Sequence, residues 1–429
     1  MVTLAGRRPD SQTSTNWAGN VAFSAERAHR PASIADLQAV VAGARQVRAL
    51  GTGHSFNRIA DTPADLVSVA GLPRVLEVDA GRRNARVSAG LRFGEVVGPL
   101  HDAGFALHNL GSLPHISIAG AIATGTHGSG VTNGTLASAV SALELVTADG
   151  SLLRLSRADD PDRFDGSVIA LGALGVVHTV ELDLQPAYDL RLYVHEGLRL
   201  ERLHTDLEEV LSSGYSVSVF WDWRSDDTSV WRRLRVDAGE APQEWRGTTL
   251  ADGPRHPIPG LPGTMCSEQQ GVVGPWHARL PHFRLEFTPS SGEELQSEWF
   301  VARQDAVAAL QSLADLRKRI APLLLISEVR AIAEDRLWLS PSAGRDTVAL
   351  HFTWVKDERA VAPVVAAVEE RLGAFAARPH WGKVFSTPPD VLRGLYERFE
   401  DFEALVRDLD REGKFRNAML EAYLPGARA

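Results

Sequence analysis

The feature that most constrains this chain is a histidine set in a glycine-rich turn, the stretch Leu50-Gly51-Thr52-Gly53-His54-Ser55-Phe56-Asn57. The turn follows a short apolar run, residues 47–50, that predicts a β-strand. Glycines at the end of a strand let the backbone adopt positive φ and let a ligand come close, so the turn would present the imidazole of His54 at a fixed point. An ordinary glycine turn that carries a surface histidine explains the same residues, because such turns are common.

A second glycine-rich stretch runs from residue 109 to residue 130 and reads NLGSLPHISIAGAIATGTHGSG. It is too small and too polar for a core strand. Its glycines, alanines and hydroxyl side chains leave many backbone N–H groups uncovered, as in loops that bind a pyrophosphate. The stretch therefore predicts a phosphate-binding loop.

The two motifs, G-[ST]-G-H-S-F and S-L-P-H-I-S-x-x-G-x-x-x-T-G-T-H-G-S-G, together resemble the flavin-binding half of the vanillyl-alcohol-oxidase superfamily. Within it the chain most resembles the alditol (xylitol) oxidases, which are related to the sugar-lactone oxidases. The likeness runs from Asn16-Trp17-Ala18-Gly19-Asn20 to Gly413-Lys414-Phe415-Arg416-Asn417. In that family the histidine of the first motif is bonded covalently to the dimethylbenzene end of FAD, so the resemblance implies covalent FAD on His54.

The resemblance also implies a set of cofactor contacts. They fall at Gly51, Thr52, Gly53, His54, Ser55, Ser112, Ser117, Gly120, Thr124, Gly125, Thr126, His127 and Val177. Judged from its residues alone, the run 171–177 is explained equally well by a glycine turn that precedes a core strand. No His-x-x-x-His spacing or carboxylate cluster accompanies His115 and His127, so the sequence predicts no metal site.

The composition narrows the class of protein. At 429 residues, with 44% hydrophobic and 23% charged residues, the chain is globular and long enough for two domains. Its net charge of -9 argues against a nucleic acid or an anionic membrane surface as partner. The single cysteine, Cys266, excludes an intramolecular disulfide and a cysteine metal cluster.

Two further observations concern location. No run reaches the ~20 apolar residues that span a bilayer. Arg7 and Arg8 invite a twin-arginine signal, but no apolar segment follows them. We therefore expect a cytoplasmic protein that acts on a small neutral substrate, and we expect a monomer.

Hydrophobic periodicity predicts an α+β protein. Helices are predicted at 34–45, 93–101, 304–320 and 361–376, with another through Leu203, Leu207, Val210 and Leu211. Strands are predicted at 46–50, 66–69, 74–78, 85–90, 193–194, 216–221, 284–287, 296–300, 323–332 and 347–355, with a hairpin turning at Asp149-Gly150. Residues 238–292 are rich in proline and glycine and have no assignable period; a segment of this length is usually functional or packed over a surface.

The resemblance implies a two-domain fold of the vanillyl-alcohol-oxidase type. An FAD-binding domain would span residues 1–187 and an α/β cap, or substrate domain, residues 188–375. Residues 376–429 would return to the FAD-binding domain.

Two neighbouring apolar strands each carry a polar pair on one face. Glu328 and Arg330 share a face of the first strand, and His351 and Thr353 share a face of the second, because side chains two apart in a strand point the same way. A structural salt bridge would explain Glu328 and Arg330 alone. Two such strands predict the wall of a polar pocket, whose buried groups need partners that a polyhydroxylated substrate would supply.

The stretch Arg378-Pro379-His380-Trp381-Gly382-Lys383 would form a third wall. By itself it is an aromatic turn with an exposed lysine. The alditol and lactone oxidases carry the same H-W-G-K, with its lysine in the active site. The resemblance therefore implies catalytic and substrate-binding roles for Ser112, Glu328, Arg330, Thr353 and Lys383, with His351 beside them.

These residues predict FAD-dependent oxidation of the terminal primary alcohol of alditols such as xylitol and sorbitol to the aldose, with O2 reduced to hydrogen peroxide. Arg330 and Lys383 would stabilise developing alkoxide charge. Glu328 would bind a hydroxyl and keep Arg330 oriented, and Ser112 would hold the reacting hydroxyl. Gly111 would leave space for O2 to reach the flavin, which favours an oxidase over a dehydrogenase.

Two alternatives remain open. One is a sugar-1,4-lactone oxidase or dehydrogenase that acts on a gulono-, galactono- or arabinono-lactone. The other is a non-catalytic flavoprotein or sugar-binding module that kept the fold.

Overall fold

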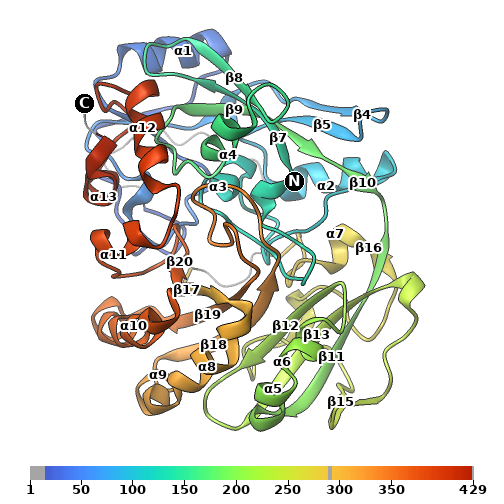
Figure 1. The fold of residues 1–429 in the computed structure, drawn as a ribbon. Helices are drawn as coiled ribbons and strands as arrows, with labels where there is room; N and C mark the ends of the chain where they lie inside the picture. The colour runs from blue at the N-terminus through green and yellow to red at the C-terminus, as the bar shows by residue number, and fades with distance from the viewer. Residues whose placement is uncertain (1–14, 288–291, 428–429) are drawn as a thin grey trace.

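The computed structural model describes residues 15–287 and 292–427 (Figure 1). Arg7 and Arg8, where a signal motif was considered, lie outside the described residues. The mixture of helices and sheets confirms the predicted α+β class. Among the described residues no helix combines the length and the apolar composition needed to cross a bilayer.

The first part of the chain builds a five-stranded antiparallel sheet, in the order β4-β5-β9-β7-β8, and a parallel sheet in the order β1-β3-β2. The strands are β1 (Arg27–His29), β2 (Val47–Ala49), β3 (Asp65–Val67), β4 (Leu76–Asp79), β5 (Asn84–Ser88), β6 (Phe105–Ala106), β7 (Val140–Val146), β8 (Leu152–Ser156), β9 (Val176–Asp183) and β10 (Gln185–Pro186). The helices are α1 (Ile34–Gly43), α2 (Phe93–Asp102), α3 (Ile118–Ala123) and α4 (Pro161–Ser167).

Local chemistry sets several of these boundaries. Helix α1 starts where the side chain of Ser33 accepts a hydrogen bond from the backbone N–H of Asp36, as the sequence predicts. The predicted hairpin is confirmed, and Gly150 turns with φ of 86° between β7 and β8. The stretch 109–130 differs from the prediction, because its apolar core, Ile118–Ala123, folds into α3.

The second part of the chain builds a ten-stranded sheet in the order β14-β15-β11-β13-β12-β18-β19-β17-β20, with β16 paired to β11. Its strands are β11 (Asp189–Arg199), β12 (Ser216–Trp221), β13 (Asp227–Arg235), β14 (Glu244–Trp245), β15 (Thr248–Leu250), β16 (Gly274–Pro275), β17 (Glu294–Ala302), β18 (Leu324–Ile332), β19 (Thr347–Val355) and β20 (Arg378–Pro379). The helices are α5 (Leu200–Thr205), α6 (Leu207–Leu211), α7 (Trp276–Arg279), α8 (Ala306–Ser312), α9 (Arg317–Ile320) and α10 (Glu358–Leu372). Figure 1 shows α8, α9 and α10 on the side of this sheet that faces away from the first part.

Several predictions for this part are confirmed and others are wrong. The strands at 216–221 and 347–355 have the predicted bounds, whereas β13 was missed. The predicted helix 304–320 is interrupted by 3-10 turns between α8 and α9. The predicted strand 284–287 is wrong: Arg284 has no regular structure and the residues after it form a turn.

The C-terminal helices α11 (Pro389–Gly394), α12 (Phe399–Leu409) and α13 (Ala418–Tyr423) return to the first part of the chain, and Figure 1 shows α12 below α1, with α13 and α11 further from it. The buried guanidinium of Arg48 donates to the carbonyl of Phe415, with Nη1–O at 2.8 Å. The ammonium of Lys414 donates to the carbonyls of Val41 and Ala42 at the end of α1. The two ends of the chain therefore share one packed unit.

Candidate functional site

A cavity of about 450 Å³ is lined by residues from both parts of the chain. It is bordered by the histidine turn, the stretch 109–130, strands β17 to β19 and the turn after β20. All six predicted substrate-contact residues line it: Ser112, Glu328, Arg330, His351, Thr353 and Lys383. Of the predicted cofactor contacts, every residue except Gly125 lines it as well.

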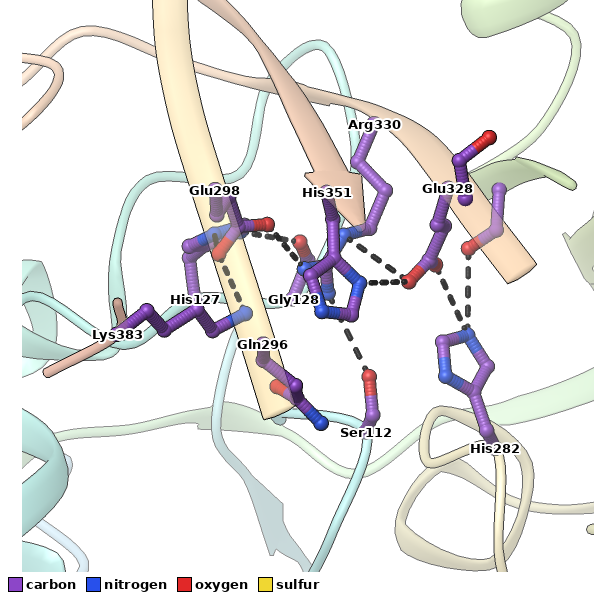
Figure 2. A network of polar contacts seen from close by, with 12 residues as sticks. Ser112, His127, Gly128, His282, Gln296, Glu298, Glu328, Arg330, His351 and Lys383 are labelled. Carbon is purple, nitrogen blue, oxygen red and sulfur yellow. Dashed lines mark hydrogen bonds and ion pairs between the residues drawn. The ribbon is translucent and has the colours of Figure 1, made fainter. Parts of the chain in front are cut away.

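Strand register places the acidic and basic side chains in one row. Strand β19 lies between β17 and β18, and His351 is directly opposite both Glu298 and Glu328. Arg330 is opposite Ala349, whose small side chain leaves room for the guanidinium. Figure 2 shows the row, with Lys383 and His282 at opposite ends.

Glu298 is the centre of this network, and the sequence analysis missed it. Its Oε1 lies 2.6 Å from Nη2 of Arg330, and its Oε2 lies 2.8 Å from Nζ of Lys383 and 3.3 Å from Nε2 of His127. The residue is 1% exposed. A signal was present, because Gln296 and Glu298 are a polar pair two residues apart in a strand, as are the pairs in β18 and β19.

Glu328 has weaker contacts. Its Oε2 is 3.5 Å from Nε of Arg330 and 3.7 Å from Nδ1 of His351, which are long for hydrogen bonds. Its Oε1 is 3.2 Å from Nε2 of His282, without the alignment of a hydrogen bond. Arg330 is thus held mainly by Glu298, whereas Glu328 keeps free hydrogen-bonding capacity.

The charges in the row balance. Burial raises the pKa of Glu298, but Lys383, His127 and Arg330 outweigh it and hold the pKa well below its usual range. Burial also raises the pKa of Glu328, but Arg330, His282 and His351 together outweigh it and hold the pKa well below its usual range. Burial lowers the pKa of Lys383, and Glu298 opposes this shift.

The histidines around the row are neutral at pH 7. Burial lowers the pKa of His351 to about 4, and Lys383 adds to this shift. Burial also lowers the pKa values of His127, His282 and His380. The charged groups of the row are therefore two carboxylates, one guanidinium and one ammonium.

The segment 238–292 shows no helix or strand periodicity in the sequence. Its described residues form one wall of the cavity. His256, Ile258, His282 and Phe283 line the cavity from this segment. The backbone N–H of His282 donates to the carbonyl of Ser112 at 3.2 Å. The segment therefore connects the glycine-rich stretch 109–130 to the row of charged side chains.

The histidine turn packs against the stretch 109–130. The hydroxyl of Thr52 accepts from the backbone N–H of Ser117 at 3.2 Å and lies 3.0 Å from Nδ1 of His54. Burial lowers the pKa of His54 to about 4, so its imidazole is neutral at pH 7. A Cβ on Gly51 would come within 2.3 Å of Oγ of Ser117, so a larger residue would require this hydroxyl to move.

The same turn fits the diphosphate and ring of a dinucleotide. Among the described residues, the backbone N–H groups of residues 51–55 have no protein acceptor. Successive uncovered N–H groups are a usual anion site. They face a cavity whose other walls include small residues such as Gly120 and Ala121.

The stretch 109–130 contains two histidines, His115 and His127, and both have partners in the protein. Nδ1 of His127 lies 2.8 Å from the carbonyl of Gly128, and its Nε2 faces Glu298. Nε2 of His115 lies 2.8 Å from the carbonyl of Leu285. Within the part of the chain that the structure describes, no group of His, Cys, Asp and Glu has the geometry to hold a metal ion.

Comparison with known protein families assigns both parts of the chain. Residues 25–156 match an FAD-binding domain, and residues 291–423 match the D-arabinono-1,4-lactone oxidase family. The chain is 51% identical to an alditol oxidase from a Streptomyces species, over 96% of this chain and 99% of that protein. It is 31% identical to an L-gulono-1,4-lactone dehydrogenase from Mycobacterium tuberculosis, over 94% of this chain and 97% of that protein.

The fold is found among solved structures. A crystal structure of cholesterol oxidase from B. sterolicum superposes with a TM-score of 0.77 at 15% identity, covering 99% of this chain and 100% of that one. This likeness confirms the predicted flavoprotein fold with an FAD-binding domain and a second domain.

Replacement of Glu298 by glutamine keeps the shape of the side chain and removes its charge. We expect the free energy of unfolding to fall by about 3–5 kcal/mol at pH 7, because two buried cations lose their partner. Since the pKa of Glu298 is depressed, its stabilisation is present above its ordinary value of 4.5 and is lost as the pH falls further. Urea denaturation from pH 7 to pH 3 should show the difference between wild type and variant shrink below that value.

Glu293→Gln is the matched control, because Glu293 is exposed and its ion-pair partner among the described residues is Lys356, at 3.6 Å. It should change the free energy of unfolding by less than about 0.5 kcal/mol. A loss of under about 1 kcal/mol for Glu298→Gln would mean that Glu298 does not hold the network together.

Proposed function

The chain belongs to the alditol oxidase family of FAD-dependent oxidoreductases, and we propose that it oxidises the terminal primary alcohol of an alditol to the aldose. Substrates of the xylitol and sorbitol type fit the site, and O2 accepts the electrons to give hydrogen peroxide. The proposal rests on a group of buried polar atoms in the row of charged side chains. Among the described residues, these atoms have no hydrogen-bond partner.

Four such atoms border the cavity. Among the described residues, Oε1 of Glu328, Nε of Arg330 and both ring nitrogens of His351 have no hydrogen-bond partner. Buried polar atoms left in this state are costly, so a ligand with several hydroxyl groups would stabilise them.

The cationic groups are placed to act on the reacting oxygen. Lys383 and Arg330 would stabilise the negative charge that develops on this oxygen when the alcohol is oxidised. Nη1 of Arg330 lies 3.5 Å from Oγ of Ser112, so that hydroxyl can hold the reacting group next to the guanidinium. Glu298 fixes both cations, and Glu328 is left to accept a substrate hydroxyl.

FAD would be held by the histidine turn and the stretch 109–130, through the predicted contacts that line the cavity. When bound, FAD supplies two-electron oxidation chemistry, and the protein supplies position and electrostatics. We propose that His54 carries the cofactor covalently, because its imidazole is neutral and borders the cavity.

Gly111 supports O2 as the electron acceptor. It lines the cavity, and a Cβ added there would meet its nearest atoms, on Thr126 and Ile116, only at 3.5 and 3.7 Å. We propose that this open position gives O2 access to the flavin.

The remaining parts of the proposal rest on the sequence. They are an FAD-binding domain at 1–187, a cap at 188–375, a C-terminal return at 376–429, a monomeric state and a cytoplasmic location.

Oxidation of a sugar-1,4-lactone is the second candidate, because residues 291–423 match the D-arabinono-1,4-lactone oxidase family. Turnover of xylitol, sorbitol and L-gulono-1,4-lactone, measured as peroxide formed under air, separates the two. We expect kcat/KM for the alditols to exceed that for the lactone by at least about 100-fold. A preference for the lactone would reverse the assignment.

Replacement of Lys383 by methionine should slow the reaction strongly while the flavin stays bound. We expect xylitol to bleach the flavin about 100- to 1000-fold more slowly under anaerobic conditions, because one charge that stabilises the developing alkoxide is lost. Stopped-flow absorbance measures this rate. Lys356→Met, at a position 30% exposed, is the control and should bleach at the normal rate; normal bleaching in Lys383→Met would reject this role for Lys383.

Covalent attachment has its own test. Wild-type protein precipitated with acid should stay yellow, and its intact mass should exceed that of the chain by the mass of FAD less two hydrogens. In His54→Ala the added mass should be absent, because the nitrogen that forms the bond is gone. Yellow colour released from precipitated wild-type protein would disprove the covalent bond and leave non-covalent FAD.

A further inference from the structure

The segment Asn16–Asn20, which we call the clamp, belongs to the sequence likeness but has no role in the function described above. In the structure it binds the backbone on both sides of His54. Its three hydrogen bonds run from Trp17 N to Gly53 O at 2.7 Å, from Asn16 Nδ2 to Ser55 O at 2.8 Å and from Asn20 Nδ2 to Phe56 O at 2.9 Å. The clamp therefore fixes the turn from which His54 projects.

Trp17 also contacts the imidazole itself. The indole and imidazole rings stack with centroids 5.1 Å apart and planes at 17°, and both residues border the cavity. The ring of Phe56 meets the indole edge-on at 6.2 Å, which holds the indole in place. With the hydroxyl of Thr52 at Nδ1, the imidazole is restrained in its plane and in its rotation.

We propose that Trp17 is a positioning residue for the covalent attachment of FAD to His54. The clamp fixes the backbone, and the indole face sets the plane of the imidazole and keeps water from one side of it. Formation of a bond to a ring nitrogen needs that nitrogen in one orientation, so a restrained ring reacts faster than a free one. This inference rests on the proposed covalent attachment.

The attachment step balances with O2 as oxidant. An imidazole nitrogen of His54 bonds to the methyl carbon at the dimethylbenzene end of FAD. One C–H bond and one N–H bond break, and one C–N bond forms. The two hydrogens and their electrons pass to O2 and give hydrogen peroxide.

The test compares Trp17→Phe, which keeps a flat aromatic face, with Trp17→Leu, which has none. Each purified protein is incubated with excess FAD in air, and intact mass follows the conversion of bound FAD into the covalent adduct. We expect conversion in Trp17→Leu to be roughly tenfold slower, the size of a lost stacking contact, and Trp17→Phe to be close to wild type. Total flavin, measured by absorbance, and Tm should be similar in both variants.

The controls separate this inference from the proposal it rests on. His54→Ala should form no adduct, and absence of adduct in wild type would reject covalent attachment itself. Equal conversion in Trp17→Leu and wild type would overturn the role of Trp17. Equally slow conversion in both Trp17 variants would overturn the role of stacking. A slow rate that is fully explained by lost FAD binding or by a lower Tm would overturn it as well.

Discussion

A buried charge needs a partner, and this requirement shapes the site. Glu298 is almost completely enclosed and bonds both cations of the cavity wall, Arg330 from β18 and Lys383 from the turn after β20. Each cation would be unstable there without it. One carboxylate thus ties together three segments of the second part of the chain, and it leaves Glu328 available for a hydroxyl group.

The sequence predicted three walls of this site, on β18, on β19 and in the turn that carries Lys383, and missed the fourth, on β17. The polar pairs of β18 and β19 were readable from alternation, and the structure pairs these strands directly. Glu298 carried the same signal but was assigned no role. Its partners lie 32 and 85 residues away in the chain, and sheet register, which a single sequence does not specify, decides that it reaches them.

Two other errors show what hydrophobic periodicity does not report. Periodicity reports which side chains face the core, and it does not report whether the backbone is continuous. Leu310, Leu313, Leu316 and Ile320 are all buried, so the apolar stripe persists across the breaks between α8 and α9. The alternation at 284–287 imitates a strand, yet its apolar side chains Leu285 and Phe287 are about two-fifths exposed.

The return of the C-terminal residues affects how the protein is made. Lys414 and Phe415 complete the surroundings of α1 and β2: Lys414 donates to carbonyls in the last turn of α1, and Phe415 accepts from Arg48. During translation the N-terminal residues leave the ribosome first, but this part of their packing has to wait for Phe415, which lies 367 residues after Arg48. The nascent chain must therefore hold the histidine turn in an incomplete unit until Lys414 and Phe415 have been synthesised, which makes this half of the structure dependent on residues added much later.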